Sequence, residues 1–405
     1  MKKNYLIIGS GVASISAAKA IRDADKDGNI SIYGEEASLP YSRIKLSKNL
    51  MNDLNNDKIL LKKPQWYEEN NIKVFDNIRI SSIDIKDNLI VTSEGEKIPY
   101  YKLLITTGAN NRSLPIPGNN KKGVFTLRDI MDANNIRTYL EGRNNVVHIG
   151  GGIQGLETAW TLHTSGKKVS IIEIGDRLMA KQLDKKASLI LKNKIEESGV
   201  NLFLNTTIDE VLGSEKVEGI AVNKNKILPC DSIIYSIGIT PNIEIIRNTE
   251  IKVNKGIIVN DNMETSVNGI YAAGDVAELQ GAIEGLWTKA MDQGKVSGSN
   301  MAGNNIKYKK AVPITMLNGF NISLLSIGDV NEGSYDDSIE EEINHKYIKI
   351  FIKNNKVVGA ISIGDVTYSQ VFKTSIEKEV SLDGINLKNI SIKNFILEIK
   401  NRLKS

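Results

Sequence analysis

The feature of this sequence that most constrains its fold is a pattern that occurs twice: an apolar strand, a glycine-rich turn and a helix of small residues. The first copy reads YLIIGSGVASISAA over residues 5–18, and the second reads VVHIGGGIQGLETA over residues 146–159. Each copy is followed by a second short apolar strand that ends in an acidic residue. Strands that alternate with helices form parallel sheets. The chain is therefore predicted to be an α/β protein with two βαβ units.

The first glycine loop has the spacing of a dinucleotide-binding turn. Gly9, Gly11 and Ser14 follow the pattern GxGxxG, with serine in place of the third glycine. A pyrophosphate needs backbone N–H groups and a helix N-terminus at close range, which the two glycines permit, while a small third residue lets the helix pack on the strand. A structural glycine turn is the alternative, but the strand, the helix and the following acid complete the pattern. Glu35 and Glu36 are both candidates to bind the ribose.

The second glycine loop carries the unmodified pattern at Gly150, Gly152 and Gly155, and Glu173 ends the strand that follows. An acid at this position accepts a hydrogen bond from a ribose 2′-hydroxyl and repels a 2′-phosphate. The sequence therefore favours NADH over NADPH as the nucleotide of the second unit. The alternative for Glu173 is a solvated acid at a strand end, which the complete pattern around it disfavours.

Two crossings separate the predicted domains. The buried strand LLITTG over residues 103–108 leads into the Pro/Gly stretch LPIPG, and the chain returns after Gly238 at Thr240–Asn242. We expect a first Rossmann-like domain made of residues 1–110 and 243–309, into which a second Rossmann-like domain, residues 111–242, is inserted. The strand that ends at Gly274 and Asp275 is expected to lead directly into a helix.

Residues 310–405 have no glycine loop and are predicted to form a small C-terminal α+β domain. The apolar runs 322–327, 347–352 and 357–363 predict antiparallel strands, and Asn354–Asn355 predicts the turn between the last two. Helices are expected over 368–378 and 390–403.

Composition excludes several classes of protein. Cys230 is the only cysteine, so the chain cannot form an internal disulfide or a redox-active cysteine pair, and a cytoplasmic location is expected. The net charge of +4 is spread along the chain, so no nucleic-acid-binding arm is indicated. No apolar run is long enough to span a membrane. The three histidines, His148, His163 and His345, show no metal-ligand spacing, and no metal is expected.

Five linked motifs resemble those of the ferredoxin reductase-like FAD/NAD flavoproteins, in the pyridine nucleotide-disulfide oxidoreductase superfamily. They are the stretch PYSRIKLSK at 40–48, the strand end Thr107–Gly108, the second loop with its added acid Glu157, the pair Gly274–Asp275 and the helix pattern WTKAMDQG at 287–294. Within that family the chain looks most similar to the NADH:rubredoxin oxidoreductase type, and the N-terminal part of NAD(P)H nitrite reductase large subunits is similar too. The cysteine that NADH oxidases and coenzyme A disulfide reductases have near residues 40–50 is absent.

The resemblance implies FAD in the first domain and NADH in the second. It implies that Asp275 holds the ribityl or pyrophosphate part of FAD and that Trp287 lies near the flavin ring, although a core position is the alternative for this tryptophan. It also implies that Lys48 and Glu157 pair beside the flavin and the nicotinamide as the catalytic residues. The residues expected to bind the cofactors are Gly9, Gly11, Ser14, Glu35, Glu36, Arg43, Lys48, Thr107, Gly108, Gly150, Gly152, Gly155, Glu157, Glu173, Gly238, Gly274, Asp275 and Trp287.

One departure from the family pattern concerns the loop around Arg43. Ile44 and Lys45 follow the arginine where a proline-containing pair is common in the family, so a differently shaped loop is expected there.

The expected activity is transfer of electrons from NADH through FAD to a small acidic electron carrier, with rubredoxin as the first choice by resemblance. The lysines at 45, 48, 289 and 295 are candidates for a basic rim that steers such a carrier. Two alternatives remain open: a flavoprotein subunit of a nitrite reductase-type complex, and an NADH-sensing interaction protein like apoptosis-inducing factor. The oligomeric state is left open.

Overall fold

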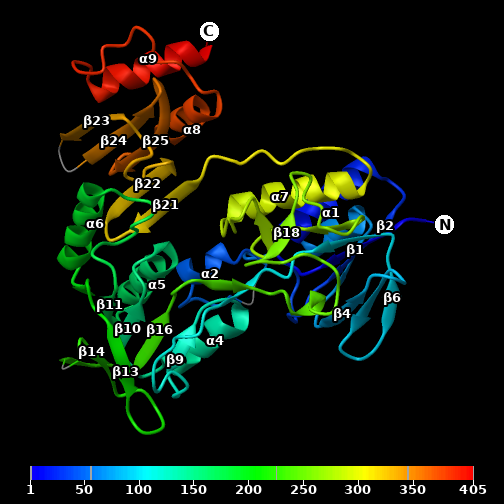
Figure 1. Cartoon of the computed structure of the whole chain (residues 1–405). Helices are drawn as coiled ribbons and strands as arrows, with labels where there is room; N and C mark the ends of the chain where they lie inside the picture. The colour runs from blue at the N-terminus through cyan, green and yellow to red at the C-terminus, as the bar shows by residue number, and fades with distance from the viewer. Residues whose placement is uncertain (1, 55–56, 225, 344–345, 405) are drawn as a thin grey trace. The chain divides into compact units, whose positions relative to one another are not determined.

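The computed structural model describes residues 2–54, 57–224, 226–343 and 346–404. The chain divides into two compact units, each assembled from three segments. Unit 1 comprises Met1–Leu46, Asp53–Arg112 and Gly238–Ala311, and unit 2 comprises Ser47–Asn52, Ser113–Ile237 and Val312–Ser405. Each unit is described by itself, and Figure 1 gives the labels of the elements.

Unit 1 is built on a five-stranded parallel sheet with the order β19-β7-β1-β2-β3. The strands are β1 (Asn4–Ile8), β2 (Asn29–Tyr33), β3 (Ile72–Phe75), β7 (Lys102–Ile105) and β19 (Ile270–Ala272). Strands β1, β7 and β19 carry consecutive buried apolar residues, as expected for parallel strands covered on both faces. Helices α1 (Val12–Ala24) and α7 (Trp287–Met301) lie against each other in Figure 1 beside this sheet.

The contact between α1 and α7 depends on two glycines of α7. A Cβ atom on Gly294 would lie 2.2 Å from the carbonyl oxygen of Ala13, and one on Gly298 would lie 2.3 Å from that of Ala17. Such distances are far below van der Waals contact, so only glycine allows the two helices to approach this closely. The small residues of α1 and the glycines of α7 therefore bring α7 next to the first glycine loop.

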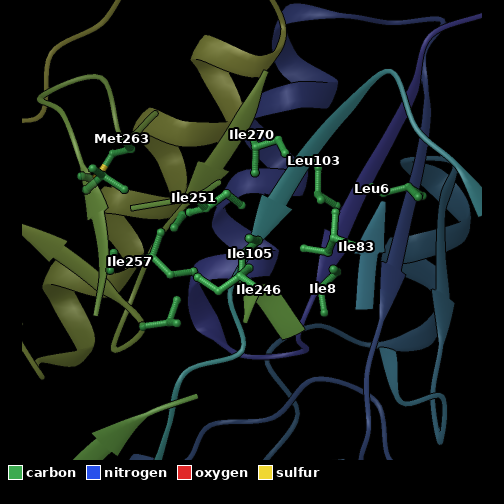
Figure 2. Close-up of a cluster of buried hydrophobic side chains, with 14 of the residues drawn as sticks. Leu6, Ile8, Ile83, Leu103, Ile105, Ile246, Ile251, Ile257, Met263 and Ile270 are labelled. Carbon is green, nitrogen blue, oxygen red and sulfur yellow. The ribbon is translucent and has the colours of Figure 1, made fainter. Parts of the chain in front are cut away.

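The other face of this sheet packs on the core cluster shown in Figure 2, where Leu6, Ile8, Leu103 and Ile105 meet side chains from later segments such as Ile257. The remaining elements of unit 1 are short, and include an antiparallel sheet of β4, β5 and β6, the pair β18–β20 and the pair β8–β17. Their bounds are α2 (Ile44–Lys48, which continues into unit 2), α3 (Pro64–Glu69), β4 (Ile80–Asp84), β5 (Leu89–Thr92), β6 (Lys97–Pro99), β8 (Ala109–Asn111), β17 (Ile239–Pro241), η1 (Glu244–Ile246), β18 (Ile257–Val259) and β20 (Ala277–Leu279).

Unit 2 repeats the same plan with a parallel sheet of order β12-β11-β10-β16-β9. Its strands are β9 (Val124–Thr126), β10 (Asn145–Ile149), β11 (Lys168–Ile172), β12 (Asn201–Phe203) and β16 (Ser232–Tyr235). Its helices are α4 (Ile130–Tyr139), α5 (Ile153–Thr164) and α6 (Lys185–Glu197). A three-stranded antiparallel sheet is formed by β13 (Ile208–Leu212), β14 (Gly219–Val222) and β15 (Lys226–Pro229).

The C-terminal part of unit 2 is an antiparallel sheet of order β21-β22-β25-β24-β23 that packs on two helices. The strands are β21 (Ile314–Gly319), β22 (Ile322–Gly328), β23 (Asp337–Ile343), β24 (Lys346–Lys353) and β25 (Lys356–Ile363), and the helices are α8 (Ser369–Glu377) and α9 (Ile392–Lys404). Asn354 and Asn355 have positive φ angles of 48° and 58°, as a tight turn between two antiparallel strands requires.

The predicted fold class is confirmed: two parallel sheets of the Rossmann type and a small C-terminal domain with an antiparallel sheet and helices. The helix expected directly after Asp275 is wrong. The chain instead turns into the short strand β20, because Ala277–Leu279 pairs in parallel with Ile257–Val259, and the helix begins only at Trp287. The prediction also missed β21, β23 and the two three-stranded antiparallel sheets. No helix within the described residues is long and apolar enough to cross a membrane.

Candidate dinucleotide sites

The first glycine loop joins β1 to α1 in unit 1. Gly9 has φ +107°, and a Cβ atom there would lie 2.2 Å from the carbonyl oxygen of Thr106. Gly11, in contrast, has no atom within 4 Å of its Cβ position, and as the N-cap of α1 it offers no side chain to the helix N–H groups. Ser14 is fully buried, and its hydroxyl donates to the Gly11 carbonyl at 2.6 Å. Open space above uncapped helix N–H groups is what a pyrophosphate requires.

The two acids after β2 have different surroundings. Glu35 is exposed and forms an ion pair with Arg79 at 2.8 Å. Glu36 is half-buried, accepts a hydrogen bond from the hydroxyl of Tyr41 and forms an ion pair with Arg43. The structure therefore brings Glu36 and Arg43, both expected to bind FAD, into one cluster, while Glu35 points to a different partner.

Gly274 and Asp275 lie at the end of β19, and α7 supports them. Gly274 has φ +82°, and its N–H donates at 2.8 Å to Oε1 of Gln293, a buried side chain of α7. The side-chain amide of Gln293 thus fixes the peptide that enters Gly274, and the partly exposed Asp275 follows directly. The sequence motif contained Gln293, but its role as a support for Gly274 appears only in the structure.

Trp287 is the first residue of α7 and is partly exposed, so it is not a core residue. Lys289, two positions later, was expected on a basic rim, and this expectation is wrong. Its side chain is 5 % exposed and paired with Glu284, because the turn before α7 places that carboxylate next to it. Lys295 is exposed, as the rim requires.

The residues at the predicted crossings meet in the antiparallel pair β8–β17. The Thr107 hydroxyl donates to the Asn242 carbonyl at 2.7 Å, and the Asn242 side chain donates back to the Thr107 carbonyl at 3.0 Å. Gly108 and Gly238 have φ +68° and +110°, so both turns need glycine. Asn242 lies in the second crossing and was not among the predicted site residues. Its two hydrogen bonds to Thr107 join the two crossings.

The second glycine loop, in unit 2, repeats the geometry of the first. Gly150 has φ +115°, with the Ser236 carbonyl oxygen 2.4 Å from its Cβ position. Gly152, the N-cap of α5, has nothing within 4 Å and provides no capping side chain. A Cβ atom on Gly155 would lie 2.3 Å from the Gly150 carbonyl oxygen. The absence of a side chain at Gly155 therefore lets the helix pack closely on the loop.

Glu173 lies at the end of β11 beside this loop. Its carboxylate accepts hydrogen bonds from the backbone N–H of Gly151 at 2.6 Å and of Gly175 at 2.7 Å. An ionised carboxylate accepts about four hydrogen bonds, so capacity for ribose hydroxyls remains. Glu173 is thus held in a defined position next to the second glycine loop rather than solvated freely at a strand end.

Lys48 and Glu157 are paired in the structure. Lys48 Nζ lies 3.4 Å from Glu157 Oε1, with side chains 52 % and 11 % exposed. The Ser47 hydroxyl donates to the other carboxylate oxygen, Oε2, at 2.8 Å. Although Lys48 lies within the range predicted for the first domain, the segment Ser47–Asn52 groups with unit 2. Ser47 was part of the quoted motif, but no role was assigned to it.

Cys230 and His148 are both buried and unreactive. Cys230 is buried, and burial raises the pKa of its thiol to about 12. His148 is buried in β10, and burial lowers the pKa of its imidazole to about 4. His345 lies outside the described residues. Within the described ranges, no group of three or more His, Cys, Asp or Glu side chains is placed to hold a metal ion.

Comparison with known proteins identifies the family of the chain. Residues 3–294 match the family described as pyridine nucleotide-disulphide oxidoreductase, and residues 313–380 match the rubredoxin NAD+ reductase C-terminal domain. The chain belongs to the pyridine nucleotide-disulphide oxidoreductase family. It is an enzyme of the rubredoxin/ferredoxin reductase type, a family whose members use FAD and NAD(P)H.

Relatives of two kinds lie within this family. The chain is 35 % identical over 381 residues to NADH-rubredoxin oxidoreductase of Clostridium acetobutylicum, covering 94 % of this chain and 96 % of the relative. It is also 35 % identical over 385 residues to nitrite reductase [NAD(P)H] of Bacillus subtilis, covering 94 % of this chain but only 48 % of that protein. The chain thus spans about half the length of the second relative.

The structure is similar to the crystal structure of NADH:rubredoxin oxidoreductase from Clostridium acetobutylicum, with a TM-score of 0.80 and 32 % identity. The match covers 98 % of this chain and 100 % of the other. The family resemblance inferred from the five motifs is therefore confirmed.

The buried His148 predicts a pH dependence of stability. Its pKa is lowered from 6.5 to about 4 by burial, so the unfolded chain binds a proton that the folded chain does not between these values. Stability should therefore fall as the pH drops below about 6.5, by about 2 kcal/mol between pH 7 and pH 5 from this residue alone. In denaturant titrations, His148→Asn should lose less stability than the parent over this range. The control His163→Asn, at a partly exposed position of α5, should behave like the parent. An unchanged slope in His148→Asn would refute the assignment.

Proposed function

We propose that this protein is an NADH-dependent FAD enzyme that delivers electrons to a small electron-carrier protein, with rubredoxin as the preferred carrier. The observation that carries the proposal is the pair of equivalent loops, in which Gly11 and Gly152 each leave open space at the uncapped start of a helix. One loop per unit gives one dinucleotide site per unit. We also propose the three-part division 1–110 with 243–309, 111–242 and 310–405, and a cytoplasmic location for a chain with a single, buried thiol.

In unit 1, the described residues fit FAD. Gly9 and Gly11 would shape the turn that receives the pyrophosphate. The Ser14 hydroxyl donates to the Gly11 carbonyl within the first turn of α1. Of the two candidate acids, we favour Glu36 for the ribose, because it shares a cluster with Arg43 and Tyr41 whereas Glu35 is exposed. Asp275, which follows the glycine held by Gln293, would hold the ribityl or pyrophosphate part of FAD, and Trp287 would lie near the ring. Thr107, Gly108 and Gly238 would shape the neighbouring crossing.

In unit 2, Gly150, Gly152 and Gly155 would hold the NADH pyrophosphate, and Glu173 the adenosine ribose. The Glu173 carboxylate is fixed by two backbone N–H groups, so it cannot turn away from a 2′-phosphate. Coulomb repulsion at this short range favours a nucleotide without that phosphate.

When bound, FAD supplies the redox chemistry, accepting hydride from NADH and releasing single electrons to a carrier. The protein's own contribution is position and charge. We propose that Lys48 and Glu157 are the catalytic pair. With FAD bound, the positive charge of Lys48 would favour the reduced cofactor, and Glu157 would set how that ammonium is held.

The choice of a soluble carrier as acceptor rests on two observations. The only cysteine, Cys230, is buried, and no metal-binding group occurs among the described residues, so no second redox centre is evident in them. The C-terminal region matches the rubredoxin NAD+ reductase C-terminal domain. Exposed lysines such as Lys48 and Lys295 would attract an acidic carrier.

A second candidate function is supported by the Bacillus subtilis relative, a nitrite reductase of which this chain spans about half. In that case the protein would be the flavoprotein part of a larger reductase, and its acceptor would be a redox centre on another polypeptide. The sensor alternative is supported less, because the likeness to apoptosis-inducing factor 3 of Mus musculus is lower, at 27 % identity over 98 % of this chain.

A panel of purified carriers tests the proposed acceptor. With NADH and catalytic amounts of this protein, rubredoxin should be reduced faster than a ferredoxin or an artificial dye at equal concentration. The rate should fall as ionic strength rises, because exposed charges steer the encounter. Rapid dye reduction with no reduction of any rubredoxin or ferredoxin would contradict the carrier proposal and favour the reductase-subunit alternative.

The charge on Glu173 should set nucleotide choice. We expect kcat/KM for NADH to exceed that for NADPH by at least about tenfold, which corresponds to roughly 1.4 kcal/mol of differential binding. Glu173→Gln keeps one acceptor oxygen but removes the charge, so it should narrow the ratio, mainly by improving NADPH. Asp176→Asn, on the same loop and exposed, is the matched control and should keep the parental ratio. Equal use of both nucleotides by the parent protein would refute the prediction.

Removing the ammonium of Lys48 should impair flavin reduction without loss of FAD. Lys48→Met keeps the aliphatic stem but not the charge, so the reduction potential of the bound flavin should fall. Hydride transfer should slow by about tenfold or more, since roughly 1.4 kcal/mol of lost charge stabilisation is sufficient. Stopped-flow reduction by NADH and a potentiometric titration would measure both. Lys295→Met is the control for a lysine outside the pair. Parental rate and potential in Lys48→Met would show that Lys48 is only a surface cation.

A further inference from the structure

The carboxylate of Glu157 is held by two neighbouring residues of α2 rather than by one. Ser47 Oγ donates to Oε2 at 2.8 Å, and Lys48 Nζ lies 3.4 Å from Oε1. All three residues belong to unit 2. The Glu157 side chain is only 11 % exposed, so solvent offers its carboxylate few other partners. The two donors therefore determine where this carboxylate lies.

The two donors differ in how firmly they hold it. The Lys48 side chain is 52 % exposed and ends a flexible four-carbon stem, so it does not hold its ammonium in one fixed place. Ser47 is buried, has one rotatable bond before its hydroxyl, and donates to a charged acceptor at short range. The hydroxyl is thus the rigid contact and the ammonium the loose one.

The backbone that carries Ser47 is anchored as well. At the far end of its segment, the Arg137 guanidinium of α4 donates to the Asn52 carbonyl at 2.6 Å. Leu46 and Leu50, on either side of Ser47, are buried. The hydroxyl therefore projects from a fixed backbone, and it fixes the Glu157 side chain in turn.

We propose that Ser47 is a positioning residue that occupies one oxygen of Glu157 and so leaves the Lys48 ammonium loosely paired. This inference rests on the proposed role of Lys48 and Glu157. Without the hydroxyl, the nearly buried carboxylate lacks a donor and draws Lys48 into a tighter pair. The positive charge available to the flavin is then reduced even though Lys48 itself is unchanged.

The experiment compares Ser47→Ala with Ser47→Thr, each alone and in the Lys48→Met background. The measurements are the flavin reduction potential, the rate of flavin reduction by NADH, the FAD content and the unfolding temperature. Ser375→Ala is the matched control, because Ser375 is also buried in unit 2 and donates one hydrogen bond, to the Phe372 carbonyl at 2.9 Å. If Ser47→Ala fails to fold, Ser47→Cys, which keeps the shape with a weaker donor, replaces it.

We expect Ser47→Ala to lower the potential and slow flavin reduction by about threefold or more, about 0.7 kcal/mol in the barrier. Ser47→Thr, which keeps the hydroxyl, should restore both, and Ser375→Ala should leave both unchanged. In the Lys48→Met background, Ser47→Ala should have no further effect, because no ammonium remains to be captured.

Three results would overturn the inference, and they separate it from the proposed function. Parental behaviour of Ser47→Ala beside a slow Lys48→Met would remove the role of Ser47 but keep that of Lys48. An equal loss from Ser47→Ala in both backgrounds would show a merely structural role. Parental behaviour of Lys48→Met would remove the catalytic pair and this inference together.

Discussion

The structure depends on a steric constraint that occurs twice, the close approach of a glycine to the backbone of a neighbouring strand end. At Gly9 the neighbour is the Thr106 carbonyl oxygen, 2.2 Å from the Cβ position, and at Gly150 it is that of Ser236, at 2.4 Å. Any side chain at either position would push the loop away from its sheet. Because the loops stay close, the helices that follow begin directly at the strand ends with their N–H groups uncapped. The two candidate dinucleotide sites follow from this constraint.

The carboxylates near these loops are each held by neighbouring donor groups. Glu173 is held by backbone N–H groups and Glu36 by Arg43 and Tyr41, so each carboxylate already has partners within its own unit. Glu157 follows the same rule with Ser47 and Lys48. Carboxylates that are oriented before a ligand arrives lose less entropy on binding, so the sites can be selective.

The parts of the fold that sequence could predict are those set by local pattern. The glycine loops, their flanking strands and the Asn354–Asn355 turn each require residue types that few other structures need. The helix expected after Asp275 could not be excluded in this way, because the pairing of Ala277–Leu279 with Ile257–Val259 is a contact between distant segments. Burial of Lys289 against Glu284 escaped prediction for the same reason. The Lys48–Glu157 pair could be predicted only from the family resemblance. The hydrogen bond from Ser47 to Glu157 joins residues far apart in the sequence, so no local pattern could predict it.

The central claim is that one chain binds FAD and NADH in two separate sites and passes reducing equivalents between them. An anaerobic titration of the purified protein with NADH, followed by the visible absorbance of oxidised flavin, tests it most directly. The account predicts that the chain carries one FAD and that one equivalent of NADH per chain bleaches it fully, without any carrier present. A protein that contains no flavin, or flavin that stays oxidised under excess NADH, would contradict the account.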